Sequence, residues 1–261
     1  MKILIAIPVI NLWSRYTEEC LKSIQCKYEH QIMIIDNHSQ DETQVKMLEL
    51  SGQDKKYLYI RNEENWGVQK SWNYAINYAK ENGFDYILLP NNDVLFHKSC
   101  IDLLIDKFEN SDNDIVMITA NDIRLECENT EKLFEKNPIE KTTAPDSPHP
   151  NFSAFMVRKD FFDIVGEFDE GFYPAYFEDN DMHYRIRLVK KKAIAIASAM
   201  FYHFGSQTQN QVSGGMVNSS LFLKNRDYYV QKWGGEPNGE LFITPFNNSQ
   251  FSIKWTKQKP I

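Results

Sequence analysis

The sequence has few cysteines, and their spacing does not suggest a metal site. Its four cysteines, Cys20, Cys26, Cys100 and Cys127, form no CxxC pair and no cluster with histidine. Because structural zinc sites need closely spaced thiolate and imidazole ligands, we expect no zinc site. Unpaired thiols are typical of a reducing compartment. We therefore expect a cytoplasmic protein, with a peripheral position at the inner face of the membrane as an alternative.

A long apolar run is also missing. No stretch approaches the roughly 20 apolar residues that a transmembrane helix needs. The apolar N-terminus, MKILIAIPVINLW (residues 1–13), contains a single lysine and is followed by no A-x-A-like cleavage site. It therefore predicts a buried first strand rather than a signal peptide. These features predict a soluble protein without a transmembrane segment.

The chain has no excess of positive charge. It contains 29 basic and 36 acidic residues, for a net charge of −7. A broad nucleic-acid surface needs a basic face, so this balance argues against one. A local basic groove could still use Lys159 or the lysine run at residues 190–192, although such runs are usually solvated faces.

What the chain does contain is enough apolar sequence for one sizeable α/β domain. Its 261 residues are 42% hydrophobic and 13% aromatic. Short apolar runs predict strands at residues 2–9, 31–35, 57–60, 85–89 and 115–119. Helix-like spacing is found at residues 13–26, 68–83 and 98–109. This alternation predicts a mainly parallel sheet with helices on both sides.

Beyond residue 121 the alternation loosens. We expect long loops at 137–152 and 205–216, the second closing over a ligand, and further strands at 153–157 and 193–198.

Polar clusters follow three of the expected strands. They are Asp-Asn at 36–37, two asparagines within 62–65, and Asn-Asn-Asp at 91–93. The last cluster alone fits a turn, and it also offers oxygen ligands for Mg²⁺ or Mn²⁺. In parallel sheets ligands bind beyond the carboxyl ends of the strands. Three such ends on one edge of a sheet therefore indicate a binding site.

The order of seven short motifs resembles glycosyltransferase family 2, whose members use nucleotide sugars and have the GT-A fold. The motifs are IPVIN, IIDNHSQDET, RNEENWGVQKSWNYAI, ILLPNNDV, VGEFDEGFYPAYFEDNDMHYRIR, YHFG and RDYYVQKWGG. By pattern the chain is most similar to the rhamnosyltransferase-like branch. The resemblance implies a Rossmann-like, mainly parallel sheet flanked by helices, with a helical and loop extension at the C-terminus. It implies one catalytic domain over residues 1–235, with a nucleotide-binding half at 1–121, an acceptor-binding half at 122–235, and an extension at 236–261.

The resemblance also implies a metal site. Asn91-Asn92-Asp93 stands where the family has its Asp-x-Asp motif, so Asp93 is the implied ligand of Mn²⁺ or Mg²⁺. Asn91 replaces the first aspartate of that motif. His203 is implied either to complete the metal shell or to contact the phosphates, and the alternative is a structural histidine.

The implied nucleotide-binding residues lie mostly at strand ends. They are Pro8, Asn11, Asp36, Asn65, Gly67, Asn73, Asn91 and Asn92. In the family the position of Asp36 accepts a hydrogen bond from the base edge; a turn or helix-capping aspartate is the alternative. Gly67 would allow the backbone to approach the nucleotide closely.

Glu178-Asp179 resembles the general base motif of the family. Asp179 is the implied catalytic base, and Glu178 orients it or the acceptor. The alternative is a charged helix start, which the helix dipole favours. Asp181 and Arg185 are four residues apart on the same expected helix and predict a structural ion pair.

The function implied is that of a metal-dependent inverting glycosyltransferase. It would move a sugar from a nucleoside diphosphate sugar, with a UDP- or dTDP-sugar as the favoured class, to a glycan or glycolipid acceptor. One alternative is a sugar-nucleotide nucleotidyltransferase, which would want a glycine-rich loop after the first strand. That place reads VINLWSRY and has no glycine. The same motifs also leave open a non-catalytic glycan-binding relative and a nucleic-acid-modifying glycosyltransferase.

Overall fold

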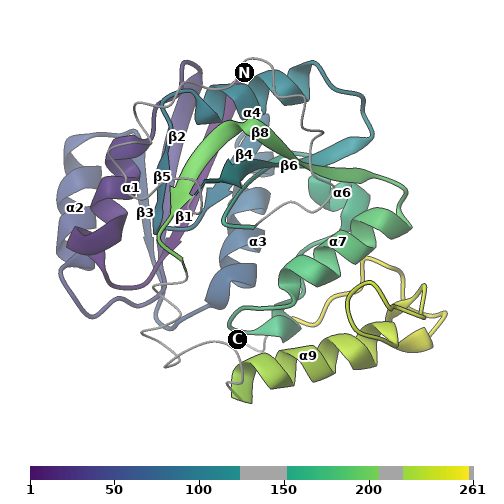
Figure 1. Ribbon diagram of the computed structural model, residues 1–261. Coiled ribbons are helices and arrows are strands. Elements are labelled where there is room, and N and C mark those ends of the chain that lie inside the picture. The colour runs from purple at the N-terminus through teal and green to yellow at the C-terminus, as the bar shows by residue number, and fades with distance from the viewer. Residues whose placement is uncertain (124–151, 206–219, 259–261) are drawn as a thin grey trace.

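The computed structural model describes residues 1–123, 152–205 and 220–258 (Figure 1). Cys127 and nearly all of the two long loops expected from the sequence lie outside these ranges. None of the helices in the described ranges is long and apolar enough to cross a membrane.

An eight-stranded sheet forms the centre of the molecule, in the order β3-β2-β1-β4-β7-β6-β8-β5. The first four strands of the chain run parallel to one another: β1 (Lys2–Val9), β2 (Glu29–Asp36), β3 (Tyr57–Arg61) and β4 (Tyr86–Pro90). Residues 3–7 of β1 are fully buried, as expected for a strand covered on both faces. The predicted α/β fold with helices flanking the sheet is confirmed.

The other half of the sheet is mixed. Its strands are β5 (Val94–Phe96), β6 (Ile115–Asp122), β7 (Ala154–Arg158) and β8 (Lys192–His203). β7 runs antiparallel between β4 and β6, and β5 runs antiparallel to β8. In these registers Pro90 pairs with Ala154 and Val94 pairs with His203. The end of β4 and the turn after it therefore lie beside the start of β7 and the end of β8.

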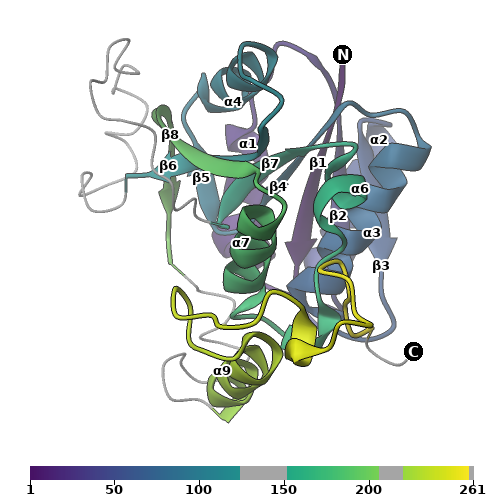
Figure 2. The same cartoon turned by 90° about the vertical axis from the view of Figure 1, so that its right-hand side faces the viewer.

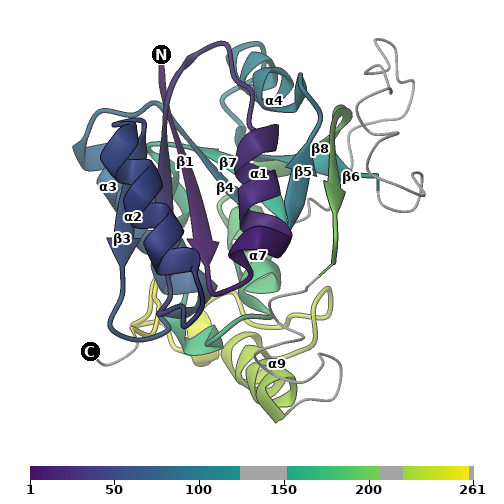
Figure 3. The ribbon, with the colours of Figure 1, turned by 90° about the vertical axis from the view of Figure 1, so that its left-hand side faces the viewer.

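Helices cover both faces of the sheet. One face carries η1 (Trp13–Thr17), α1 (Glu18–Ser23), α2 (Thr43–Gln53) and α4 (Cys100–Glu109), and the other carries α3 (Gly67–Glu81), α6 (Phe161–Val165) and α7 (Glu178–Leu188). Figure 1 shows α1 and α2 to the left of the sheet and α6 and α7 to the right, and Figure 3 shows α1 and α2 from the front. Two separate apolar cores result, because alternate residues of β1, such as Ile5 and Ala6, enter opposite clusters.

Helix α2 is absent from the elements expected from the sequence. Only Thr43 and Met47 of its eleven residues are buried, so the helix has almost no apolar period to detect.

The C-terminal segment packs against α7. It comprises α9 (Ser220–Trp233) and an irregular stretch containing η4 (Pro245–Asn247), and Figure 2 shows it below α7. An aromatic cluster joins α9 to α7 and to η3 (Glu170–Phe172): Phe172, Phe177, Tyr184, Tyr229 and Trp233.

Candidate active site

A cavity of about 430 Å³ lies at the carboxyl ends of β1 and β4. Residues 174–176 and the start of α7 also line it. The structure brings most of the predicted site residues into its lining: Pro8, Asn65, Gly67, Asn91, Asn92, Asp93, Glu178, Asp179 and His203. Of the three polar clusters expected at strand ends, Asn37, Asn65 and residues 91–93 line the cavity, whereas Asp36 and Asn62 do not.

Asp93 and His203 lie together on one wall. Nε2 of His203 is 3.2 Å from Oδ1 of Asp93, and Nδ1 of the same ring is 3.2 Å from Oγ of Ser153. All three residues are buried. The antiparallel pairing of β5 with β8 produces this arrangement, because Asp93 precedes the pair formed by Val94 and His203.

The two neighbouring asparagines are tied to the protein. The side-chain amide of Asn92 donates to Oγ1 of Thr17 at 3.0 Å. The backbone N–H of Asn91 donates to the carbonyl of Ser153 at 2.8 Å. Residues 91–93 thus form a turn that these hydrogen bonds hold in place, and Asp93 of this turn lines the cavity.

The donor set fits a divalent cation that shares its coordination with substrate. Among the described residues, no three His, Cys, Asp or Glu side chains gather closely enough to hold a metal by themselves. Asp93 and His203 offer one carboxylate and one imidazole. Mg²⁺ is commonly held by one or two carboxylates, with phosphate oxygens and water completing the shell, and Mn²⁺ accepts the same oxygen ligands and also imidazole.

Glu178 and Asp179 lie on another wall of the cavity, where they begin helix α7. Nε2 of Gln69 donates to the Glu178 carboxylate at 3.3 Å, and the backbone N–H of Asn180 donates to the Asp179 carboxylate at 2.7 Å. Burial raises the pKa of both carboxyl groups, and the charge of Asp179 raises the pKa of Glu178 further. Carboxylates with raised pKa values are better proton acceptors.

Asp36 does not reach the cavity lining. It is fully buried at the end of β2, and both of its carboxylate oxygens are engaged. Oδ2 accepts hydrogen bonds from the Tyr59 hydroxyl at 2.6 Å and from Arg61 at 2.7 Å, while Oδ1 accepts from the Ser39 N–H at 2.8 Å. A base edge would have to compete with these partners for the same carboxylate.

Asn11 and Asn73 also lie outside the cavity lining. Asn11 accepts from the Gln40 N–H at 2.7 Å, so it fastens the loop after β1 to the loop after β2. The Asn73 amide exchanges two hydrogen bonds with the backbone of Phe168, at 2.9 and 2.8 Å. In the structure both asparagines therefore bond to other loops of the protein rather than to the cavity.

Several residues of the lining were not anticipated from the sequence, among them Trp72, Phe152 and Ser153. Ser153 and Phe152 gave no signal, because only the antiparallel insertion of β7 brings them there. Trp72 lies on the apolar face of an amphipathic helix that the sequence predicts. The spacing of apolar residues does not show whether such a side chain lines a cavity or packs in the core.

Gln69, which holds Glu178, offered a weak signal. It is a buried amide on the same face of α3 as Trp72 and Asn73. The Asp181–Arg185 ion pair predicted from the sequence is confirmed, with an N···O distance of 2.9 Å and both side chains fully buried.

Comparison with known families decides the assignment. The model of glycosyl transferase family 2 matches residues 4–164. The chain belongs to glycosyl transferase family 2. A galactofuranosyl glycosyltransferase of Leishmania donovani is 32% identical over 108 residues, which are 41% of this chain and 24% of that protein. The chain thus spans about a quarter of the length of this relative.

Solved structures of low sequence identity share the GT-A architecture of this family 2 chain. GalNAc-T7, solved with UDP, GalNAc and Mn²⁺, has a TM-score of 0.66 at 17% identity, over 89% of this chain and 49% of its own. S. aureus TarS 1-349 has a TM-score of 0.58 at 17% identity, over 88% and 70%. The mannosyltransferase PcManGT of Pyrobaculum calidifontis, solved with GDP-Man and Mn²⁺, has a TM-score of 0.57 at 13% identity, over 77% and 56%. At these identities the likeness concerns the fold.

Proposed function

We propose that the chain is a metal-dependent inverting glycosyltransferase that uses a nucleoside diphosphate sugar. One observation carries the proposal. A single cavity has a pair suited to hold a cation, Asp93 and His203, and also a pair of carboxyl groups with raised pKa values, Glu178 and Asp179. Transfer of a sugar from a diphosphate requires both kinds of group.

The donor side is formed by the ends of β1 and β4 and the start of α3. Asp93 and His203 would hold Mn²⁺ or Mg²⁺. Gly67 lines the cavity at the start of α3, and a Cβ there would lie 2.9 Å from the carbonyl oxygen of Pro174, so its missing side chain lets residues 173–174 approach. A bound cation would neutralise the charge of the diphosphate and stabilise it as a leaving group. The ligands in the GalNAc-T7 and PcManGT structures, a nucleotide or nucleotide sugar with Mn²⁺, support this assignment. We propose a UDP- or dTDP-sugar as the donor.

The acceptor side is the start of α7. Asp179 is proposed to remove the proton of an acceptor hydroxyl while that oxygen forms a bond to the anomeric carbon. The bond from that carbon to the diphosphate oxygen breaks, and its electron pair leaves with the diphosphate. A single displacement of this kind inverts the anomeric configuration. Glu178, held by Gln69, is proposed to orient Asp179 or the acceptor.

The proposed acceptor is a glycan or glycolipid, and the proposed location is cytoplasmic. The acceptor class is proposed from the resemblance of the sequence to family 2 alone. The described cysteines, Cys20, Cys26 and Cys100, are free thiols, which agrees with a reducing compartment.

Differential binding of nucleotides tests the proposal before any acceptor is known. Thermal unfolding is followed with UDP, dTDP and GDP, each with Mn²⁺, with Mg²⁺ and with EDTA. A ligand that binds only the folded state raises the melting temperature by mass action. We expect UDP or dTDP to do so only when the metal is present. If no combination of nucleotide and metal shifts the melting temperature, the proposal is wrong. If a shift is seen and a product can be made, NMR of that product tests inversion.

A further inference from the structure

Helix α7 begins at a conformationally unfavourable turn. Tyr176 and Phe177, the two residues before Glu178, have φ values of 80° and 70°. Bulky side chains rarely adopt this left-handed region, and residues held there need support from their surroundings. The direction in which Glu178 and Asp179 enter the cavity depends on this turn, because it sets the start of the helix that carries them.

The support comes from helix α9, through Asn225. This residue is fully buried, and its side-chain Nδ2 group donates to the carbonyls of Phe172 at 2.6 Å and Ala175 at 2.8 Å. The carbonyls of Tyr173 and Tyr176 lie 3.3 and 3.4 Å from the same nitrogen. One amide therefore gathers four carbonyls of the loop that precedes the catalytic pair, while the carbonyl of Pro174 accepts from the N–H of Val68. That loop is also cavity wall, since residues 174–176 line the cavity.

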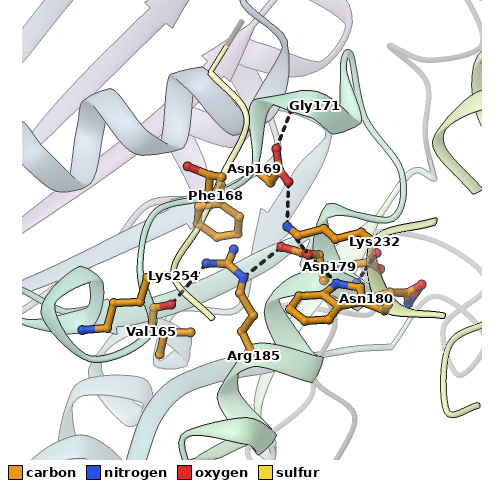
Figure 4. A network of polar contacts seen from close by, with 12 residues as sticks. Val165, Phe168, Asp169, Gly171, Asp179, Asn180, Arg185, Lys232 and Lys254 are labelled. Carbon is orange, nitrogen blue, oxygen red and sulfur yellow. Dashed lines mark hydrogen bonds and ion pairs between the residues drawn. The ribbon is translucent and has the colours of Figure 1, made fainter. Parts of the chain in front are cut away.

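A second contact holds the first turn of α7 itself. Asp181 accepts from Nζ of Lys232 at 2.7 Å and from the indole N–H of Trp233 at 2.8 Å, both at the end of α9. Lys232 also pairs with Asp169 at 2.6 Å, and Arg185 pairs with Asp181. The four charged side chains are fully buried and sum to zero net charge, so removing any one leaves a buried charge uncompensated. Figure 4 shows Lys232 reaching Asp169, and Arg185 reaching the carbonyl of Val165.

We infer that α9 is part of the catalytic apparatus and that Asn225 is a positioning residue for Glu178 and Asp179. This inference rests on the proposed function of that pair. Helix α9 lies outside residues 4–164, the part of the chain that the family model matches. The loop before α7, the first turn of α7 and α9 thus all lie beyond the matched residues. Asn225 contacts neither donor nor acceptor in this scheme. It holds the loop before α7, and that loop sets the position of the two carboxylates.

Asn225→Ala tests the inference, with Tyr184→Phe as a matched control. Tyr184 donates to the carbonyl of Phe242 at 2.8 Å, so its hydroxyl helps to dock the C-terminal segment without bonding to the loop. We expect Asn225→Ala to lower kcat by about ten- to a hundredfold, the scale of a small misplacement of reacting groups. The affinity for UDP and Mn²⁺ should stay within about twofold of wild type, because the donor wall is untouched. Tyr184→Phe should lower the melting temperature while kcat stays near the wild-type value.

Asn225→Asp distinguishes donation from mere packing. The carboxylate has nearly the same shape, but it has no N–H to donate and repels the four carbonyls. It should lower kcat at least as much as alanine does. If Asn225→Asp turns over like wild type, or if kcat falls equally in Tyr184→Phe, the positioning role is wrong.

Trp233→Phe keeps the inference testable where Asn225 variants do not fold. It removes the indole N–H that Asp181 accepts while keeping an aromatic ring in the cluster, and it should lower kcat with unchanged affinity for UDP and Mn²⁺. Unchanged kcat in a folded Trp233→Phe variant would count against the inference. Failure of the proposed function has a different signature. Glu178→Gln and Asp179→Asn would then both keep wild-type turnover, whatever the Asn225 variants do.

Discussion

His203 and Asp93 are held face to face by the backbone as well as by their side chains. Nε2 of His203 lies 3.2 Å from Oδ1 of Asp93. Around this contact Val94 pairs with His203, and the N–H of Phe204 donates to the carbonyl of Asp93 at 3.0 Å. Two prospective cation ligands are thus preorganised by strand pairing, which lowers the cost of arranging them when a cation binds.

Asp93→Asn should abolish the metal-dependent part of UDP or dTDP binding. The amide keeps the shape and an oxygen that His203 can contact, so the fold should survive, but the charged ligand is lost. Isothermal titration with and without Mn²⁺ measures the effect. Asp106→Asn, a surface change on α4, serves as the control and should bind like wild type. An Asp93→Asn variant with wild-type metal dependence would leave Asp93 as a turn residue only.

Asp179→Asn should keep donor binding and lower turnover by about two to four orders of magnitude, the usual scale of general base catalysis. The carboxylate is replaced by an amide of nearly equal size, so the cavity should keep its shape. Steady-state transfer assays with a competent acceptor give kcat, and nucleotide titration gives the donor affinity. A product that retains the donor's anomeric configuration would contradict the proposed single displacement, even if turnover falls.

The stability of the protein should depend on pH through Glu178. Burial and the neighbouring charge of Asp179 raise the pKa of Glu178 from 4.5 to about 8 in the folded state. Between these values the folded state retains a proton that the unfolded state releases, so the stability contribution of this group falls as pH rises through the window.

Glu178→Gln removes this dependence, because glutamine does not titrate. The melting temperature of the variant relative to wild type should therefore increase from pH 5 to pH 8.5. Each kcal/mol corresponds to about 2–4 °C for a chain of this size. Calorimetry of both proteins across that range makes the comparison, and a constant difference would show that Glu178 ionises normally.

Asp36→Ala should destabilise the fold more than it weakens nucleotide binding. It removes the acceptor shared by the Tyr59 hydroxyl, Arg61 and the Ser39 N–H. Leaving such groups unsatisfied costs about 1–3 kcal/mol each where they are buried, and the cost is smaller for the partly exposed Arg61. Denaturant unfolding measures the loss. UDP affinity measured in the same variant should fall less than tenfold, and a larger fall with normal stability would indicate a direct contact with the base.

The sequence was informative where local pattern and chemistry coincide. Strands β1 to β4 are short apolar runs, and the polar residues that follow them meet at one edge because parallel strands share their direction. Asp93 and Glu178-Asp179 were singled out because motifs in a familiar order surround them, and the structure places all three in the lining of one cavity. Helix α2 was missed because a helix with a single buried apolar side chain, Met47, has no detectable period.

Contacts between segments that are distant in the sequence could not be predicted from local sequence patterns. Nothing near Asn225 in the sequence indicates that its amide will gather the carbonyls of Phe172, Tyr173, Ala175 and Tyr176. The place of Ser153 beside His203 depends on the antiparallel direction of β7. Asp36 shows the opposite case. The position was recognised, but Tyr59 and Arg61 on the neighbouring strand β3 decide what its carboxylate can do.

The pairing of β5 with β8 also determines when this site can exist. Asp93 and His203 are 110 positions apart, and contacts of such long range form slowly because the intervening chain must first be ordered. On a ribosome, the first half of the protein is complete well before β8 emerges. A nascent chain that stops short of β8 therefore lacks the imidazole and the strand that aligns it. The proposed cation site cannot form until synthesis has passed residue 203, so a shorter nascent chain should not bind a diphosphate through it.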